Sequence, residues 1–188
     1  MNSRTPSDVI DDYLVLESQA GAPEAFRRLF ERWHPRLLRQ AFRYARSVDA
    51  ARDITQESWM AIVKGISGLS DAARFRPWAY RIVANKARDW VRREQAQRRA
   101  MTDAVAVTDT VPTVQAAAEH TGPARNIQRI REGIERLEPE QRLILTWFYL
   151  EEMALRDIAE ALSIPVGTVK SRLFHARAAL RAHLMEEP

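Results

Sequence analysis

Four polar side chains between residues 77 and 93 share one face of a predicted helix. Arg81, Asn85, Arg88 and Arg92 are spaced four, three and four residues apart, which keeps them on one side of a helix. Arginine binds phosphate through a planar fork of donors, and asparagine can hydrogen-bond the edge of a base. The stripe therefore predicts contact with a nucleic acid rather than bond-making chemistry.

Aromatic residues stand at the start of the same stretch. Phe75, Trp78 and Tyr80 lie beside its first basic residues. Unpaired bases stack on aromatic rings, which offsets part of the cost of opening a duplex. The three residues are therefore candidates for holding single-stranded DNA. Core packing is the alternative, and for Trp78 the sequence leaves both interpretations open.

Residues 155–173 have the pattern of a helix-turn-helix. In its second helix Val169, Leu173, Ala176 and Leu180 form an apolar stripe, spaced four, three and four residues apart. The opposite, exposed face carries Lys170, Ser171, Phe174, His175, Arg177 and Arg181. Such a face fits the major groove of DNA. A plain helical hairpin with basic residues in water is the alternative.

A third polar group lies near residue 55. Asp53, Gln56 and Glu57 are spaced i, i+3 and i+4, so they share one helix face and form a compact polar patch. Taken alone, such a patch is ordinary solvated surface. Its place in the chain, ahead of the other two motifs, is what makes it a candidate docking site.

Other functional classes find no support in the sequence. The 188 residues include no cysteine, which excludes a disulfide framework, thiol catalysis and cysteine-based zinc sites. The four histidines are scattered, and no phosphate loop or metal-ligand spacing is present, so we expect no catalytic residue, metal or cofactor. The longest apolar run, 143–150, is far shorter than the roughly 18 residues of a membrane span. With no secretory signal visible, we expect a cytoplasmic protein without membrane insertion.

Charge is distributed unevenly along the chain. Lys and Arg number 29 against 25 Asp and Glu. Residues 74–99 hold nine basic and two acidic residues, and 165–184 hold four basic and none acidic. Between them, 100–124 contain three acidic residues and no Lys or Arg. Two basic regions joined by an acidic connector predict two contacts on one polyanion, although solvated helix faces would give the same pattern.

The elements that position these residues are predicted to be helices throughout. Apolar residues recur at helical spacing and no strand-like alternation is visible, so we expect an all-α fold. Ser7 is the expected cap of the first helix, and Pro77 the expected first residue of the basic helix. Pro35 predicts a break or kink. Ser163 stands in the turn of the helix-turn-helix where glycine is common, which predicts mild strain there.

Two small helical domains are expected, joined by a flexible linker. The first spans 1–99 and the second, which contains the helix-turn-helix, spans 125–188. The linker, 100–124, is rich in Ala, Val, Thr and Pro and shows no helical period.

Two stretches carry a family resemblance. Residues 164–177, IPVGTVKSRLFHAR, look like the promoter-reading end of bacterial RNA polymerase sigma factors of the extracytoplasmic-function (ECF) group. Residues 50–59, AARDITQESW, are similar to that family's polymerase-binding helix. The motifs come in the family's order, and the resemblance covers nearly the whole chain except the connector.

The resemblance implies a transcription initiation factor, not an enzyme. It would bind core RNA polymerase, recognise the −35 and −10 elements of promoter DNA and stabilise the melted strand. The implied polymerase-binding residues are Asp53, Gln56 and Glu57. The implied −10 residues are Phe75, Trp78, Tyr80, Arg81, Asn85, Arg88 and Arg92, with Asn85 on a flipped base beside the loop 69–76. The implied −35 residues are Thr168, Lys170, Ser171, Arg172, Phe174 and His175.

The sequence departs from the family pattern at two positions. His175 stands where an arginine is common, and Arg52 where an acidic residue is common. An anti-sigma factor is a further partner that the resemblance admits. A DNA-binding regulator that works without polymerase is the alternative function, and it would leave the Asp53 patch without purpose. Binding to core polymerase distinguishes the two.

Overall fold

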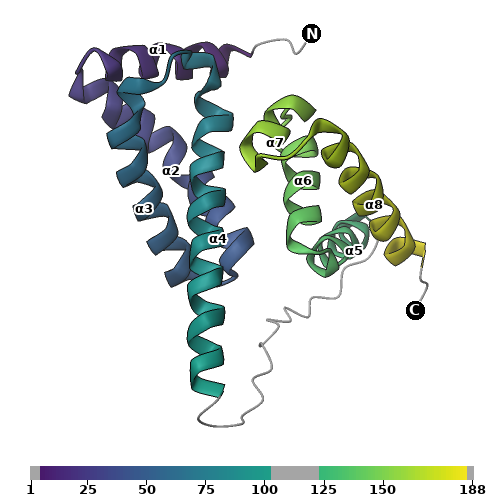
Figure 1. Ribbon diagram of the computed structural model, residues 1–188. Helices are drawn as coiled ribbons and strands as arrows, with labels where there is room; N and C mark the ends of the chain where they lie inside the picture. The colour runs from purple at the N-terminus through teal and green to yellow at the C-terminus, as the bar shows by residue number, and fades with distance from the viewer. Residues whose placement is uncertain (1–4, 103–122, 186–188) are drawn as a thin grey trace.

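The computed structural model describes residues 5–102 and 123–185, and every regular element in those ranges is helical, which confirms the all-α class. Figure 1 shows the helices in two groups, α1–α4 and α5–α8. The elements are α1 (Pro6–Gln19), α2 (Pro23–Ala45), α3 (Val48–Gly65), the short 3-10 turns η1 (Ile66–Gly68) and η2 (Ala72–Arg74), α4 (Phe75–Thr102), α5 (Pro123–Arg136), α6 (Pro139–Tyr149), α7 (Leu155–Leu162) and α8 (Val166–Met185).

Most of the predicted linker, 100–124, lies outside the described residues. Its first three residues, 100–102, are the last of α4, and its last two, 123–124, are the first of α5. The domain bounds expected from the sequence therefore fall inside helices by two or three residues, and they stay predictions.

The first helix begins earlier than predicted. Thr5, not Ser7, is its N-cap: the Thr5 hydroxyl accepts from the amide of Asp8 at 3.3 Å, and the Asp8 carboxylate accepts from the amide of Thr5 at 2.8 Å. This reciprocal capping box, with Pro6 as the first helical residue, satisfies the free amides at the helix start. Ser7 instead accepts a hydrogen bond from Arg32 at 3.0 Å.

Pro35 does not end the second helix. The helix α2 runs from Pro23 to Ala45 with Pro35 inside it. Pro35 is on the exposed side, while Leu29, Trp33 and Leu37 are buried. Because the carbonyl that a proline leaves unpaired can bond water on this side, the buried face keeps the helix continuous through it.

The basic helix begins two residues before the predicted start. Asp71 caps the turn η2 by accepting from the amide of Ala73 at 3.0 Å, and α4 follows directly at Phe75. Pro77 therefore lies within the first turn, where its missing amide hydrogen is no loss.

The core of the first group is formed mainly by α2, α3 and α4. Leu29 and Leu37 of α2, Ile62 of α3, and Ala79 and Val83 of α4 all have no exposed surface. The small residues of α4 let that helix approach its neighbours closely, and its polar stripe lies outside this contact. The bundle therefore fixes which side of α4 can face a ligand.

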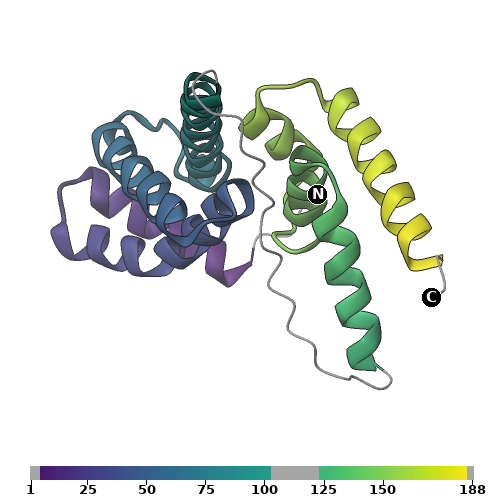
Figure 2. The same ribbon diagram turned by 90° about the horizontal axis from the view of Figure 1, so that it is seen from below.

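The second group packs α8 across α5, α6 and α7. Trp147 of α6, Ile158 of α7 and Val169 of α8 are fully buried. Figure 2 shows α5 and α8 side by side, and Gly133 permits that approach because a Cβ there would lie 2.5 Å from Leu180.

The two groups also contact each other, which the sequence analysis did not anticipate. Helix α7 packs against α4, as Figure 1 shows, and the buried residues of both groups form one cluster. Among the described helices none is both long and apolar enough to cross a membrane. The same residues contain no cluster of three or more potential metal ligands.

Candidate nucleic-acid interface

The turn of the helix-turn-helix depends on a left-handed residue. Ser163 adopts φ 56° and ψ 43°, and the amide of Ile164 donates to the carbonyl of Ala159 at 3.0 Å, which closes α7. A side chain in this conformation costs about 1 kcal/mol relative to glycine. Ser163 therefore has the conformation that favours glycine, and this supports the mild strain predicted there.

Helix α8 has the two faces that the sequence predicted. Val169, Leu173 and Ala176 are buried and Leu180 is half-buried. The opposite face is exposed, with the Phe174 side chain 67% accessible. Its exposed predicted contact residues are Lys170, Ser171, Phe174 and His175. The −35 surface inferred from spacing is therefore available to solvent.

The other two predicted −35 residues are less exposed. Arg172 is half-buried and forms an ion pair with Glu140 at the start of α6. Thr168 is half-buried in the first turn of α8, where its amide donates to Pro165 at 2.9 Å. Arg172 thus ties α8 to α6, in a position to orient the helix as well as to contact DNA.

The polar stripe of α4 is only partly accessible. Asn85 and Arg92 are exposed, whereas Arg81 and Arg88 are half-buried. Arg88 donates to the side-chain oxygen of Asn85 at 2.9 Å and lies 3.5 Å from the carbonyl of Leu162 in α7. Arg92 forms an ion pair with Asp89. The four residues share one side of the helix, as their spacing predicted.

The aromatic residues are a correction to the sequence analysis. Phe75 is 1% exposed and meets Trp33 edge-on at 5.1 Å between ring centroids, so it is a core residue. Tyr80 has no exposed surface, and its ring stacks on Trp147 of α6 at 5.4 Å. Burial raises the pKa of Tyr80. Of the three, Trp78 alone is partly exposed.

The polar patch of α3 lies on a groove shared with α4. Asp53 and Gln56 are exposed, and the groove, of about 440 Å³, is also lined by Trp90 and Arg93. Glu57 is ion-paired within the chain, 3.3 Å from both Lys86 and Arg93. Although partial burial would raise it, these hydrogen bonds keep the pKa of Glu57 below its ordinary value. Asp53 and Gln56 are the freer members of the patch.

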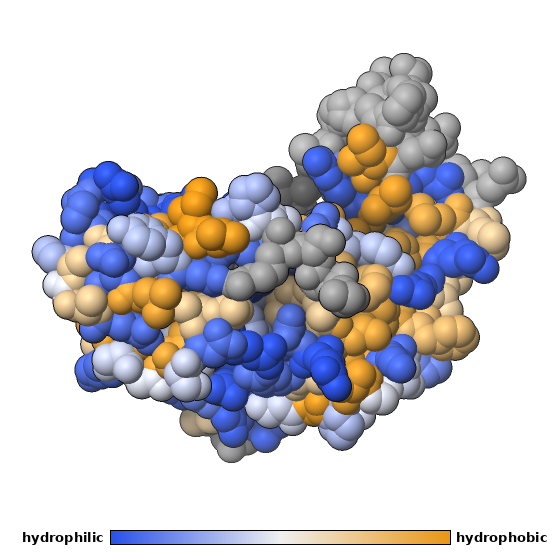
Figure 3. All heavy atoms as spheres, turned by 90° about the horizontal axis from the view of Figure 1, so that it is seen from above, coloured by the Kyte–Doolittle hydropathy of each residue, from blue (hydrophilic) through white to orange (hydrophobic). Residues whose placement is uncertain are grey.

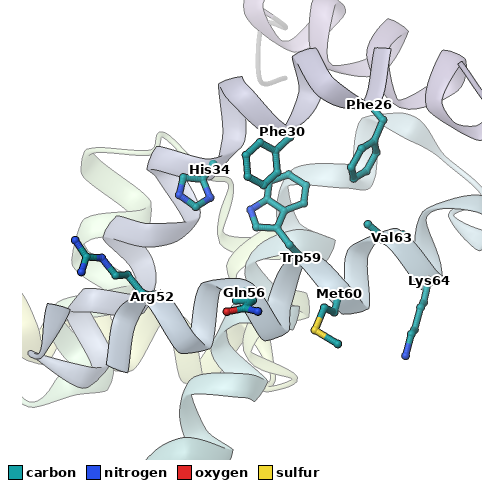
Figure 4. A pocket seen from close by; sticks show the side chains of 9 residues that line it. All are labelled: Phe26, Phe30, His34, Arg52, Gln56, Trp59, Met60, Val63 and Lys64. Carbon is teal, nitrogen blue, oxygen red and sulfur yellow. The ribbon is translucent and has the colours of Figure 1, made fainter. Parts of the chain in front are cut away.

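An apolar hollow beside this patch was missed by the sequence analysis. Figure 4 shows its lining: Phe26, Phe30 and His34 project from α2, and Arg52, Gln56, Trp59, Met60, Val63 and Lys64 from α3. The hollow measures about 560 Å³, and Met60 and Val63 are more than half exposed. The available signal was that α3 carries apolar residues on a second face, outside its core stripe. Exposed apolar surface of this kind is typical of a protein interface.

The molecular surface is a mixture of polar and apolar residues. Figure 3 shows hydrophobic residues in small separate groups over the left half and in larger ones over the right half, where Figure 1 draws the C-terminal helices. Exposed apolar residues include Val9, Ile10 and Leu16 of α1 and Leu150 after α6. Hydrophilic and hydrophobic residues are thus interspersed over this face of the molecule.

Both halves match family models. Residues 29–97 match the model described as Sigma-70 region 2, and residues 127–180 match Sigma-70, region 4. The ECF RNA polymerase sigma factor SigM of Mycobacterium tuberculosis is 30% identical over 90% of this chain and 82% of its own length. SigW of Bacillus subtilis is 25% identical over 92% and 95%, and the sigma-E factor of Escherichia coli 28% over 90% and 92%.

Solved structures have the same fold. CnrH, determined in complex with the cytosolic domain of CnrY, superposes with a TM-score of 0.65 at 23% identity and covers 95% of this chain and 99% of its own. The sigma factor RpoE of Bartonella quintana, in complex with the anti-sigma factor NepR, gives 0.65 at 19% identity over 87% and 98%. At these identities the likeness concerns the fold alone.

Proposed function

The chain belongs to the extracytoplasmic-function group of bacterial RNA polymerase sigma factors, and we propose that its two helical halves bind different elements of one promoter. As a member of this family it binds core RNA polymerase and directs promoter-specific initiation of transcription. It acts on RNA polymerase in the cytoplasm, as a transcription initiation factor.

The −35 element is assigned to α8. Lys170, Ser171, Phe174 and His175 form its exposed face, opposite the buried stripe that contains Val169. Side chains on such a face reach base edges in the major groove, where each good contact is worth about 1–3 kcal/mol. Arg172 and Thr168 support this surface from its edge and its first turn.

The −10 element is assigned to α4. Asn85, exposed in the middle of the polar stripe, is the residue we assign to a flipped base. Arg81, Arg88 and Arg92 flank it and suit the phosphates of the melted strand. Trp78 is partly exposed near the start of the same helix, and Tyr80 joins these residues only if its ring is uncovered.

Polymerase is assigned to the patch on α3. Asp53 and Gln56 are exposed there, and Glu57 is held beside them by its ion pairs with Lys86 and Arg93. An anti-sigma factor is a further proposed partner, since the RpoE structure with this fold contains one.

This assignment depends on one observation. The two family models match the two halves of the chain in order, and each half carries a different exposed surface. Region 2 matches the half with the Asp53 patch and the Asn85 stripe, and region 4 matches the half with the exposed face of α8.

Run-off transcription with core polymerase on a promoter library tests the proposal. We expect defined start sites with the natural chain.

Lys170→Ala should weaken binding to the upstream duplex by about 1–3 kcal/mol per lost base contact. Asn85→Ala should leave that binding intact and reduce permanganate reactivity of the melted strand. A chain that binds core polymerase but directs no start site, or an Asn85→Ala variant that opens promoters normally, would contradict it.

A further inference from the structure

Two arginines of α8 lie on the two flanks of its buried stripe. Arg172 directly precedes Leu173 of the stripe, and Arg177 directly follows Ala176. Because a helix turns by about 100° per residue, the two arginines lie on opposite sides of the stripe, between it and the exposed face. Each of them is therefore placed to contact the helices on which α8 packs.

Both arginines contact the same neighbouring helix, α6. Arg172 forms an ion pair with Glu140, in the first turn of α6. The guanidinium of Arg177 lies over the rings of Phe148 and Tyr149 at the other end of α6, 5.6 and 5.3 Å from the two ring centroids. Figure 1 shows α6 and α8 next to each other, and the two helices are in contact. Helix α8 is thus held on α6 at two points, one on each flank.

The pair of Arg172 with Glu140 is directional but adds little stability. A carboxylate in the first turn of a helix interacts favourably with the helix dipole, and a guanidinium–carboxylate pair has a defined geometry. The side chains of Arg172 and Glu140 are 35% and 51% exposed, and ion pairs this accessible to water contribute little to the free energy of unfolding. The main effect of the pair is therefore on the orientation of α8.

Helix α6 is itself fixed to the end of α5. Arg142 is 8% exposed and donates hydrogen bonds to three backbone carbonyls there, of Ile134 at 3.0 Å, Glu135 at 2.6 Å and Leu137 at 2.9 Å. Basic side chains often satisfy the last carbonyls of a helix in this way. Because α6 is held at its own start, it can set the direction of a helix that packs on it.

The rotation of α8 about its axis decides which of its side chains point at base edges. Lys170 and His175 lie on the exposed face, on either side of its centre. Recognition requires side chains to be held within about 10–20° of their productive direction. Turning α8 in either direction would draw one of its two flanking arginines away from α6.

We propose that Glu140 is a positioning residue for recognition of the −35 element. It holds Arg172 on one flank of α8, while Phe148 and Tyr149 hold Arg177 on the other, and together these contacts fix the rotation of the helix. Arg172 then acts through Glu140 and not as a ligand of a phosphate. This inference rests on the proposed role of α8 in binding the −35 element.

The test measures how well the holoenzyme distinguishes two promoters. Core RNA polymerase is combined with the full-length chain, and its affinity is measured for a promoter selected by run-off transcription and for the same promoter with a scrambled −35 element. We expect Glu140→Gln to lower the ratio of the two affinities about fivefold, because a misdirected base contact loses part of its discrimination. The affinity for the scrambled promoter should not fall. The matched control is Glu138→Gln, which removes the same charge from the exposed N-cap residue of α6 and should keep the ratio.

Arg172→Gln tests the same contact from its other side. We expect the same fivefold loss, and no further loss when Arg172→Gln and Glu140→Gln are combined, because both remove one interaction. A phosphate contact by Arg172 would give a different pattern. Arg172→Gln would then weaken binding to both promoters and lower the slope of log affinity against log salt by about 0.9, and Glu140→Gln would strengthen binding to both. That pattern would overturn the proposal.

Tyr149→Leu tests the other flank of α8. We expect a smaller loss in the ratio, of about twofold, because Arg177 keeps its contact with Phe148 and exposed contacts of this kind are weak. An unchanged ratio would overturn the part of the proposal that concerns this flank.

The scrambled promoter separates a defect in folding from a change in direction. If Glu140→Gln lowered both affinities in equal proportion, Glu140 would support the fold alone and the proposal would be overturned. If the natural chain bound both promoters equally, the assignment of α8 to the −35 element would itself fail. If the natural chain and Glu140→Gln distinguished the promoters equally well, only the positioning role of Glu140 would fail.

Discussion

Ser163 has a left-handed backbone conformation in the turn before α8, the helix that we assign to the −35 element. It is among three described residues other than glycine with positive φ. We expect Ser163→Gly to raise the free energy of unfolding by about 1 kcal/mol, because glycine adopts this conformation without the Cβ penalty. Urea denaturation followed by circular dichroism measures the difference.

A matched substitution in regular helix provides the control for that prediction. Ser171→Gly, within α8, should lower the free energy of unfolding by about 0.5 kcal/mol. If both glycine variants were destabilised alike, the left-handed turn would not be a source of strain.

The ion pairs of Glu57 predict a pH dependence of stability. Its folded-state pKa lies below the ordinary value of 4.5, so the carboxylate contributes stability above that value and loses it as the pH falls through the lower folded pKa. We expect Glu57→Gln to be less stable than the natural chain at neutral pH and equally stable in acid. Urea titrations at both pH values test this, and a deficit that persisted in acid would argue against it.

Residues whose environment is local were predictable. The spacing of Val169, Leu173 and Ala176 placed Lys170 and His175 on the exposed face, because helix periodicity depends only on neighbours in the sequence. Tyr80 and Phe75 could not be placed in the same way. Their partners, Trp147 and Trp33, come from other helices, and an aromatic residue next to basic ones fits a core as well as a DNA groove.

Among the elements, α2 is the one whose sequence and structure disagree most. Pro35 lies inside it and is exposed, so the helix lacks one hydrogen bond at no packing gain. We expect Pro35→Ala to raise the free energy of unfolding by about 1–2 kcal/mol, after allowing for the greater freedom of the unfolded chain. Chemical denaturation measures this change in the free energy of unfolding. An unchanged midpoint would contradict the prediction and indicate that α2 depends on the bend that proline favours.

Helix boundaries were predicted to within a few residues, and the errors have local causes. Thr5 caps α1 because Asp8 completes its capping box, a pairing that Ser7 cannot make. Helix α4 begins before Pro77 because the turn η2 leads directly into it. The apolar hollow of α3 escaped prediction because a single amphipathic stripe was assumed where Met60 and Val63 form a second one.

At the scale of the molecule, the contact between α4 and α7 could not have been predicted. Arg74 and Asp157 are 83 residues apart, and nothing in the local pattern of either marks the other as its partner. Both had been interpreted as parts of separate domains. The all-α class and the order of the two halves could be predicted from the sequence, because they depend only on local periodicity and on the order of the motifs.

Polymerase binding should be visible in the exchange of backbone amides. If the halves separate on the polymerase, α7 loses its contact with α4, whereas α8 keeps its contacts with α5, α6 and α7 of its own half. We expect hydrogen exchange to become faster in 155–162 and to change little in 166–185 when the chain binds core polymerase. Mass spectrometry of the two peptides measures this, and unchanged exchange in 155–162 would indicate that the contact persists in the complex.

The pairing of Arg74 with Asp157 and Glu160 has a consequence for unspecific binding to DNA. A chromosome offers about a million or more unspecific sites to any cationic surface. Because Arg74 is already paired within the chain, its guanidinium adds nothing to this unspecific attraction while the contact with α7 lasts.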